Sequence, residues 1–542
     1  MNRRTFLVGS AATLAAGRTA TALAQDENPG APAPAGEDGP APVFCHSVAS
    51  GDPLPTAVII WTRVTPSPDA APGSGLGEPT DVRWEVLADD DSNTIVASGD
   101  LRTSPEQDHT VKVDVKGLQP DTRYRYRFHA LGQTSREGRT RTAPAPGAPN
   151  DHARIAVCCC ANYEAGFFRG YREMADREDI DYVLHLGDYT YEYPTGGYPG
   201  PFQETVRTVA PPNRTTTLTD YRIRQGHYHL DPDLADMRAS KPLISVWDDH
   251  EFADNNWRDG ATGNTIQPGD DYQAMKAQAM QAYQEWMPIR ELPLQRTVRW
   301  GSLMDIIIPD LRSFRDKQLQ MGTWDPKQSM LGGEQFTWFS NELRNSEATW
   351  RVIGNEVMFA PMTIPLTMDP NIQAWLTDKL GLPPQGIPYN TDQWDGYQAE
   401  RQRILDQLAE DGKGNTVFLT GDIHSSWANS LLARGSSGDT VATEFVSPSI
   451  CAASPFDTIA KKRELAEPVR QAIRAAERTL CQADYWVKWV DLEHHGYLLV
   501  DFTRDRALAE WRHVDNAQSP DTPFYTNFAF QTFPGRPGVY YL

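Results

Sequence analysis

Three short stretches of the chain place acids, histidines and a tyrosine directly after apolar runs. These side chains are Asp188 and Tyr191 in "VLHLGDYTYEY", Asp249 and His250 in "LISVWDDHEFADNN", and Asp422 and His424 in "VFLTGDIHSSW". Carboxylate, imidazole and phenolate groups are ligands for metal ions. In open α/β sheets, functional groups gather where strands end at their carboxyl side. The pattern therefore predicts a metal site at one edge of a buried sheet.

The spacing within two of these stretches favours a shared function. Asp188 and Tyr191 lie three residues apart, so one loop can turn both toward the same ion. Asp422 and His424 lie two apart, so in extended backbone both side chains leave on one face. Taken alone, Asp188 also fits a turn cap, and the second pair fits a turn aspartate with a surface histidine.

Two further strand ends carry groups of the same kind. "AVCCCANY" ends in Cys160 and its neighbours, and "VIGNEV" offers Asn355. Each of the five strand ends is a weak signal by itself. Together they favour a functional site over five unrelated turns.

The other histidines divide by their position in the apolar runs. His250 alone fits a core histidine, but beside two acids at a strand end it indicates function. His185 lies inside the strand "YVLHL" and is expected to pack in the core. His494 and His495 precede "GYLLV" and fit either interpretation, so we keep them outside the candidate site.

The chain has six cysteines, three of them consecutive. Adjacent side chains of extended backbone point to opposite faces, so Cys158, Cys159 and Cys160 pair poorly with one another. Cys451 with Cys481 is the expected disulfide. Cys160 remains a candidate thiolate ligand, whereas the alternative makes all three small buried apolar residues.

Two groups of elements must position these residues. Residues 43–146 contain short alternating runs separated by turn signals, which predict a β-sandwich of immunoglobulin or fibronectin type. In "TRYRYRF", Tyr124, Tyr126 and Phe128 share one face, as in a half-buried strand. Residues 147–542 alternate buried strands with amphipathic helices, which predicts an α/β core.

Several segments of the α/β region have specific expectations. "RIAVCCC", "PLISV", "LMDIIIPD" and "NTVFLT" read as strands, and "AERQRILDQLAED" and "ELAEPVRQAIRAAERTL" as helices. "HGYLLVDFT" and "RALAEWRHV" read as a weaker repeat of the strand–helix pattern. A lid role for the segment after about Cys481 is an open alternative.

Composition and charge narrow the possible partners. The 542 residues suggest two or three domains, and a net charge of −21 leaves no basic excess to neutralise nucleic-acid phosphates. Anionic substrates stay possible, since a metal cluster attracts them locally. No apolar stretch after the N-terminal region is long enough to span a bilayer.

The N-terminus predicts export. Residues 1–24 combine Arg3 and Arg4 with a mildly apolar run and an Ala-Leu-Ala sequence, as in a twin-arginine signal peptide with its cleavage site. A short amphipathic helix is the alternative. Residues 25–42 are rich in Pro, Gly and acids and predict a flexible linker. The twin-arginine translocase is then a partner, and the mature protein is periplasmic or secreted.

Eight motifs together resemble the PhoD-type alkaline phosphatase family of the metallophosphatase superfamily. They are "SVASGDPLPTAVIIWTRV", "CANYEAGFF", "LHLGDYTYEY", "VWDDHEFADNNW", "LGGEQFTWF", "WRVIGNEVMFAP", "QWDGYQAER" and "TGDIHSSW". The resemblance implies an all-β fibronectin-like domain before a four-layer α/β/β/α metallophosphatase core. It also implies Fe³⁺ and Ca²⁺ as cofactors, with phosphomonoesters and phosphodiesters as substrates.

The resemblance also implies roles for individual residues. Iron would be held by Cys160, Asp188, Tyr191 and His424. Calcium would be bound by Asp188 as a bridge and by Asp249 and Asp422, with Asn355 at a fourth position. His250, with Asn255 or Asn256, would stabilise developing charge.

Departures from the wider superfamily agree with this assignment. Asp249 stands where the superfamily has Asn, and Asp422 replaces a histidine, so one half of the site becomes oxygen-rich and suits Ca²⁺. One departure within the family concerns Cys159, which stands where a serine is usual. It is an alternative ligand to Cys160, but the C-x-N-Y spacing into "EAGFF" favours Cys160. The implied reaction is direct attack on phosphorus by hydroxide formed on the metals, without a covalent phosphoenzyme.

Two other functions fit the same residues. A phospholipase D-like phosphodiesterase would use the same cluster. An exported phosphate- or calcium-binding protein without catalysis is the alternative of another class, although the retained Asp188, Tyr191, His250 and His424 argue against it.

Overall fold

The computed structural model describes residues 42–542 except 91, 263–264, 322 and 365–369. The predicted signal peptide at residues 1–24 therefore lies outside the described residues, as does the predicted flexible linker apart from Pro42. No helix within the described ranges is long and apolar enough to cross a membrane.

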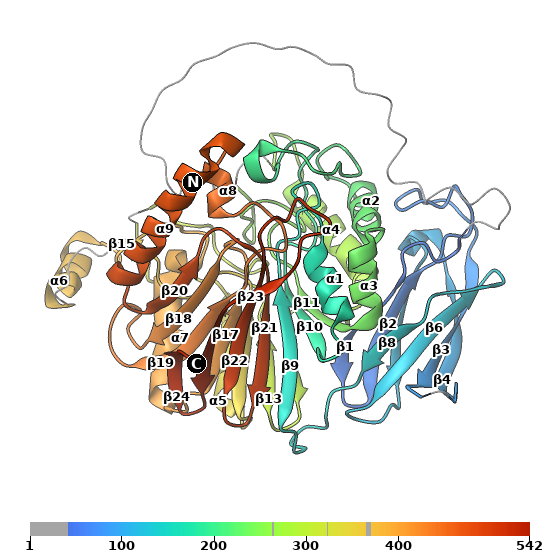
Figure 1. Cartoon of the computed structure of the whole chain (residues 1–542), viewed down its shortest axis with the longest axis horizontal. Coiled ribbons are helices and arrows are strands. Elements are labelled where there is room, and N and C mark those ends of the chain that lie inside the picture. Colours follow the sequence, from blue (N-terminus) through green and yellow to red (C-terminus); the bar gives the residue numbers. More distant parts are fainter. Residues whose placement is uncertain (1–41, 91, 263–264, 322, 365–369) are drawn as a thin grey trace, which may run out of the picture.

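One large sheet runs through most of the molecule (Figure 1). Its order is β24 (Arg536–Tyr540), β23 (Tyr525–Phe533), β22 (Ala507–Val514), β21 (His495–Thr503), β9 (His152–Cys158), β10 (Tyr182–Leu186), β11 (Pro242–Val246), β1 (Val48–Leu54), β2 (Ala57–Arg63) and β5 (Thr110–Lys116). The four strands β9, β10, β11 and β1 are parallel neighbours, and the flanking pairs are antiparallel. The carboxyl ends of β9, β10 and β11 therefore meet at one edge of this sheet.

A second sheet of seven strands packs beside the first. Its order is β12 (Arg296–Trp300), β13 (Met304–Ile308), β14 (Trp350–Asn355), β17 (Thr416–Thr420), β19 (Thr440–Val446), β18 (Ser426–Leu432) and β20 (Val487–Asp491). Strands β13, β14, β17 and β19 are parallel. A small ribbon pairs β15 (Thr363–Ile364) with β16 (Ile387–Pro388).

Alternating side chains show how the layers are built. Ile306 and Val352 belong to the apolar core shared with the ten-stranded sheet, whereas their neighbours Ile307 and Ile353 belong to a second core on the opposite face. Successive side chains of a strand point to opposite faces, so the seven-stranded sheet separates the two cores. The second core includes helical side chains such as Phe339. The two sheets thus face each other, with helices covering their outer faces.

The helices have boundaries that the sequence explains locally. They are α1 (Arg169–Asp176), α2 (Leu218–His229), α3 (Pro232–Ser240), α4 (Tyr272–Trp286), α5 (Gly333–Asn345), α6 (Pro370–Leu380), α7 (Gln398–Asp411), α8 (Pro455–Ile459) and α9 (Ala466–Ala483). Thr217 and Asp220 form a capping box at the start of α2. Asp231 caps α3 before Pro232, and Gly412 ends α7 with left-handed backbone at φ 58°.

The N-terminal β-region contributes strands to two sheets. Its separate sheet has the order β4 (Ile95–Thr103), β3 (Thr80–Ala88), β6 (Arg123–Ala130) and β7 (Gln133–Thr134), and β8 (Gly138–Arg141) also pairs with β6. Tyr124, Tyr126 and Phe128 of β6 are buried on one face, which confirms the predicted half-buried strand. The other three strands, β1, β2 and β5, extend the ten-stranded sheet, because Ser50 pairs with Pro242 of β11.

The tail differs from its predicted strand–helix pattern. "RALAEWRHV" forms β22, an antiparallel neighbour of β21. Ala507, Ala509 and Trp511 are buried at every second position, and this period of two fits a strand. The predicted strands β9, β11, β13 and β17 and the helices α7 and α9 are confirmed.

Candidate active site

The carboxyl ends of β9, β10 and β17 bring together four predicted ligands. One ligand atom each from Cys160, Asp188 and His424 lies within 4.8 Å of the others. The Tyr191 hydroxyl donates to Asp188 Oδ2 at 3.0 Å and lies 3.4 Å from His424 Nε2. All four side chains are buried. A thiol, a carboxylate, a phenol and an imidazole thus converge on one point.

A second group of ligand-type side chains, rich in carboxylates, adjoins the first. Asp248, Asp249 and Asp422 place carboxylate oxygens within 4.8 Å of one another. Carboxylate oxygens of Asp188 and Asp249 and a ring nitrogen of His250 also lie within 4.8 Å of one another. Asp188 therefore belongs to both groups, which is the position that a bridging ligand requires. The structure thus brings together the carboxylates that the sequence analysis assigned to the oxygen-rich half of the site.

The electrostatics of this cluster call for cations. Burial and the neighbouring Cys159 raise the pKa of the Cys160 thiol well above its usual range, and Asp188 and Asp422 raise it further. Burial likewise raises the pKa of Asp248, despite the opposing effect of Arg312. A thiolate among these carboxylates is stable only beside positive charge, and the mixed donor set is of a kind that could hold a metal ion.

Left-handed backbone is concentrated at these strand ends. Five site residues other than glycine have φ between 50° and 70°: Cys160, Asp188, Asn255, Asp422 and His424. Such residues are uncommon and cluster at functional sites, where the surrounding structure holds them. The sharp turns after the strands aim the side chains back over the sheet edge.

Gly187 allows two of the strand ends to approach. Its φ is 91°, and a Cβ built on it would lie 2.3 Å from the Cβ of Asp248 and 2.5 Å from its backbone nitrogen. Glu251 braces the same junction, because its carboxylate accepts from the backbone N–H groups of Asp188, Tyr189 and Asp248 at 2.8–3.0 Å.

His250 is held by a buried carboxylate that the sequence reasoning missed. Its Nδ1 lies 2.8 Å from Glu192 Oε2, and its ring stacks on Tyr191 with centroids 4.4 Å apart. Its Nε2 lies 4.0 Å from Asp249 Oδ2. Burial would lower the pKa of His250, but Asp249, Glu192 and Asp188 outweigh it and raise that pKa well above its usual range. Glu192 immediately follows Tyr191, so "DYTYE" contained the signal.

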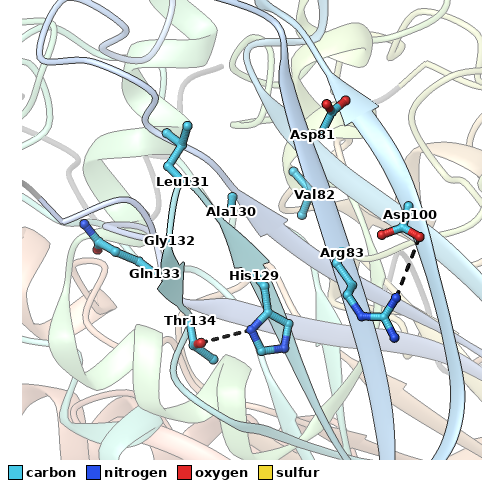
Figure 2. A pocket seen from close by; sticks show the side chains of 10 residues that line it. All are labelled: Asp81, Val82, Arg83, Asp100, His129, Ala130, Leu131, Gly132, Gln133 and Thr134. Atoms are coloured by element: carbon cyan, nitrogen blue, oxygen red, sulfur yellow. Dashed lines mark hydrogen bonds and ion pairs between the residues drawn. The ribbon is translucent and has the colours of Figure 1, made fainter.

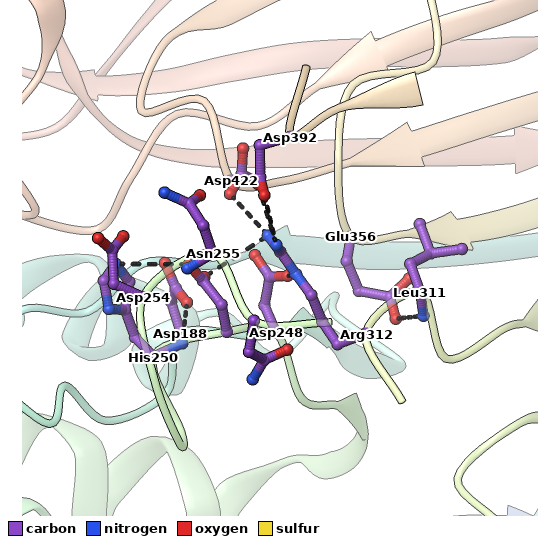
Figure 3. Close-up of polar contacts among 12 residues, drawn as sticks. Asp188, Asp248, His250, Asp254, Asn255, Leu311, Arg312, Glu356, Asp392 and Asp422 are labelled. Carbon is purple, nitrogen blue, oxygen red and sulfur yellow. Dashed lines mark hydrogen bonds and ion pairs between the residues drawn. The ribbon is translucent and has the colours of Figure 1, made fainter. Parts of the chain in front are cut away.

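Arg312 is the second residue that was missed. Its guanidinium is fully buried and donates to Asp248, to both oxygens of Asp392 at 2.9 and 3.1 Å, and to Asp422 at 3.3 Å. Figure 3 shows it lying between these carboxylates. Arg312 follows β13 in "IIIPDLRSF", so the rule of strand ends, applied to this strand as well, would have found it.

The predicted asparagines occupy different environments. Asn255 donates its backbone N–H to Asp249 Oδ2 at 2.6 Å. The side-chain oxygen of Asn255 and both amide atoms of Asn256 are buried and have no hydrogen-bond partner among the described residues. Buried polar groups of this kind are normally satisfied, so these amides point to a ligand.

Asn355 lies at the end of β14, but its amide is already engaged. Its nitrogen donates to Val357 O at 2.5 Å and to Thr420 Oγ1 at 2.9 Å, and its oxygen accepts from Trp394 at 3.0 Å. None of these three hydrogen bonds reaches a residue of the cluster.

The cysteines correct one prediction. All six are free thiols, so the expected disulfide between Cys451 and Cys481 is wrong. Cys451 lies in the core between the two sheets, whereas Cys481 packs against the core on the other face of the seven-stranded sheet. Cys159 Sγ lies 3.7 Å from Pro448 O, and Cys160 joins the cluster.

The remaining histidines lie apart from the cluster. His185 is fully buried in β10 and contacts the Tyr171 hydroxyl at 2.8 Å, which confirms its packing role. His494 contacts Asp491 at 2.8 Å, and His495 contacts Asp457 at 2.9 Å.

A depression of about 430 Å³ lies elsewhere, on the separate sheet of the N-terminal region (Figure 2). Its lining includes Arg83 and Asp100, which form an ion pair at 3.8 Å, and His129, which contacts Thr134 at 2.9 Å. It contains none of the predicted site residues.

Comparisons with known proteins agree with this geometry. The family model described as PhoD-like phosphatase matches residues 155–511, and the model of the N-terminal domain of PhoD-like phosphatase matches residues 31–144. Alkaline phosphatase D of Bacillus subtilis (strain 168) is 34% identical over an alignment of 434 residues, and the match covers 75% of this chain and 69% of that protein.

Two solved structures are similar over most of the chain. A structure of PhoD is 29% identical with a TM-score of 0.78, covering 94% of this chain and 93% of that one. The purple acid phosphatase PPD1 from yellow lupin (Lupinus luteus) has a TM-score of 0.51 at 12% identity, covering 90% and 73% of the two chains, and it supports the fold alone. The protein is thus a phosphatase with a metallophosphatase-like fold, and its chain belongs to the PhoD-like phosphatase family.

Proposed function

We propose that the protein is an exported, metal-dependent phosphoester hydrolase that acts on phosphomonoesters and phosphodiesters. The observation that carries this proposal is the convergence of Cys160, Asp188, Tyr191 and His424 beside the carboxylates of Asp249 and Asp422. The family membership supports the hydrolase class. Export follows from the predicted twin-arginine signal at residues 1–24.

The donor sets suit two different ions. Thiolate, phenolate, imidazole and carboxylate from Cys160, Tyr191, His424 and Asp188 would hold Fe³⁺. The carboxylates of Asp188, Asp249 and Asp422 would hold Ca²⁺, which prefers oxygen ligands. Asn355 is left out of the set because its amide is satisfied by three internal hydrogen bonds. When bound, these ions would neutralise phosphate oxygens and lower the pKa of a water molecule.

Side chains of the protein would orient the phosphate and stabilise the developing charge. The Glu192 carboxylate fixes the His250 ring, so that its other nitrogen faces the side of Asp249. That nitrogen would donate to the phosphate or to the leaving oxygen. The buried amide nitrogen of Asn256, which has no hydrogen-bond partner among the described residues, would donate to another phosphate oxygen and stabilise charge as it develops. The amide nitrogen of Asn255, the preceding residue, is the proposed second donor.

The proposed reaction forms no covalent phosphoenzyme. The hydroxyl that follows His424, that of Ser425, donates to Ile423 O at 3.1 Å and accepts from Trp427 at 2.8 Å. Water is therefore the proposed nucleophile. Stable phosphoprotein during turnover would contradict this mechanism.

The test compares two tyrosines of the same loop. In Tyr191→Phe we expect kcat to fall about 100-fold or more, because a ligand to the proposed iron is lost. Tyr189 lies two residues away and its hydroxyl contacts His229 at 3.0 Å, so Tyr189→Phe should keep its activity. The exported enzyme would be assayed with p-nitrophenyl phosphate and bis-p-nitrophenyl phosphate, and iron and calcium would be measured in the same samples.

Each result has a definite meaning. Iron and calcium in the wild-type protein, with less iron in Tyr191→Phe, would support the ligand assignment. Zinc or manganese alone would overturn the metals and keep the hydrolase. The ratio of diester to monoester turnover separates a phosphodiesterase from a general phosphatase.

A further inference from the structure

A second group of metal-ligand side chains lies outside the proposed active site. Asp491 ends β20, His494 follows in the next loop, and His513 lies in β22. One ligand atom from each falls within 4.8 Å of the others. His494 Nδ1 lies 2.8 and 3.1 Å from the two oxygens of Asp491. This group shares no residue with the proposed active site around Asp188.

A fourth side chain borders the group. The amide nitrogen of Asn527, in β23, donates to Asp491 Oδ2 at 3.1 Å and lies 3.1 Å from His513 Nδ1, so Asn527 links two members of the group. Ligand atoms at about 2.0–2.1 Å around a tetrahedral ion lie roughly 3.3 Å from one another. The 2.8 Å between His494 Nδ1 and Asp491 Oδ2, and the 4.8 Å within which all three ligand atoms lie, bracket that arrangement.

The exposure of the ligands suits an incoming cation. His494 has 22% of its side chain exposed, whereas His513 is fully buried. The group therefore has one side open to solvent and a rigid inner wall. Two imidazoles and a carboxylate form the borderline donor set that zinc prefers.

We propose that Asp491, His494 and His513 bind one divalent transition-metal ion, of which Zn²⁺ fits best, with water as the fourth ligand. The ligands come from both large sheets, because β20 belongs to the seven-stranded sheet and β22 and β23 to the ten-stranded one. A bound ion would therefore connect the two sheets.

The site also adjoins the loop of His424. Ser426 pairs with Asp491 across β18 and β20, and its hydroxyl contacts His513 Nε2 at 3.0 Å. Only Ser425 separates it from His424. A metal ion here therefore steadies the strand from which a proposed active-site ligand projects, and its role is structural.

The experiment counts zinc in the exported, full-length enzyme after incubation with ZnCl₂ and removal of loose metal. The wild type is compared with His494→Gln, with the double variant Asp491→Asn/His494→Gln, and with His129→Gln as a matched control. His129 likewise contacts a carboxylate, at 3.1 Å from Glu85, but in the N-terminal region. We expect wild type and His129→Gln to hold one more zinc per chain than the other two variants, with equal iron in all four.

Thermal unfolding gives a second measurement, which does not need turnover. Zn²⁺ should raise Tm in the wild type and in His129→Gln and leave His494→Gln unchanged. Should the double variant fail to fold, His494→Gln alone carries the comparison. Equal zinc content and equal Tm shifts in wild type and His494→Gln would overturn the site. A zinc difference that persists in enzyme lacking iron would support it even if the proposed catalytic metals are wrong.

Discussion

At the scale of single residues, both carboxylate oxygens of Glu192 accept hydrogen bonds from the loop that follows β11. One oxygen accepts from His250 Nδ1 at 2.8 Å and the other from the Asp254 N–H at 2.8 Å. Fixing one nitrogen of an imidazole determines what its other nitrogen can do. Glu192 is therefore a positioning residue that acts through His250.

Replacing Glu192 tests this role. In Glu192→Gln we expect kcat to fall about 10- to 100-fold with little change in KM, because the His250 ring loses its charged partner while substrate binding is kept. Glu85→Gln serves as the control, since Glu85 contacts His129 at 3.1 Å away from the site. Steady-state kinetics on a monoester would show both effects. An equal loss in the two variants would mean that the effect is general destabilisation.

Single residues also mark the limit of what the sequence could predict. The structure brings Cys160, Asp188, Tyr191, Asp249, Asp422 and His424 to one cluster, and each follows an apolar strand in the sequence. Their role as ligands stays a prediction. Arg312 was missed because the rule of strand ends was not applied to β13. The left-handed φ values of five site residues are set by tertiary packing and have no signature in a single sequence.

At the scale of elements, α9 ends in a buried acid. Burial and the nearby carboxylate of Asp395 raise the pKa of Asp484 from 3.8 to about 7. The folded protein therefore holds this proton at pH values where the unfolded chain has released it. Ionisation of Asp484 therefore lowers the free energy of unfolding as pH rises from about 4 to about 7. Above about pH 7 this destabilisation is fully present.

Replacing this acid tests the pH dependence. Asp484→Asn removes the charge, so the variant should exceed the wild type by about 2 kcal/mol at pH 8 and by less at pH 5. Thermal unfolding at the two pH values would measure the difference. The same gain at both pH values would show that packing, rather than ionisation, is responsible.

Elements also show where periodicity succeeds and where it fails. The amphipathic pattern of α9 and the apolar runs of β11 and β17 predicted their structures directly. "RALAEWRHV" was assigned to the helical pattern, although its alternation of Ala507, Ala509 and Trp511 fits the antiparallel pairing with β21. In a stretch this short, the helical period of about 3.6 and the strand period of about 2 are hard to distinguish by sequence. The presence of β21 as a pairing partner decides for the strand.

At the scale of the whole molecule, the N-terminal region is bound to the catalytic strands by backbone and side chains. β1 pairs with β11, and Asp52 forms an ion pair with Arg296 at 2.7 Å. Trp61 donates to Glu285 O at 2.8 Å. The sequence predicted a sandwich followed by a linker and gave no sign that its strands continue the next sheet, because pairing between distant strands depends on register.

A truncation tests how far the regions depend on each other. A chain of residues 147–542 would expose the edge of β11 and the apolar surface around Trp286, so we expect it to aggregate. Residues 25–542 should stay monodisperse as the control. Size-exclusion chromatography of both chains would measure this. A soluble and active 147–542 chain would show that the catalytic region folds alone.

The shared ladder between β1 and β11 also bears on how such a chain can change over evolutionary time. A module joined by a tether can be exchanged for another without altering its neighbour. Here the hydrogen bonds of Ser50 and Gly51 fix the edge of a strand that leads directly into Asp248 and Asp249. An insertion that shifts this register would move the ligand loop with it, so the N-terminal region and the catalytic loop must diverge together.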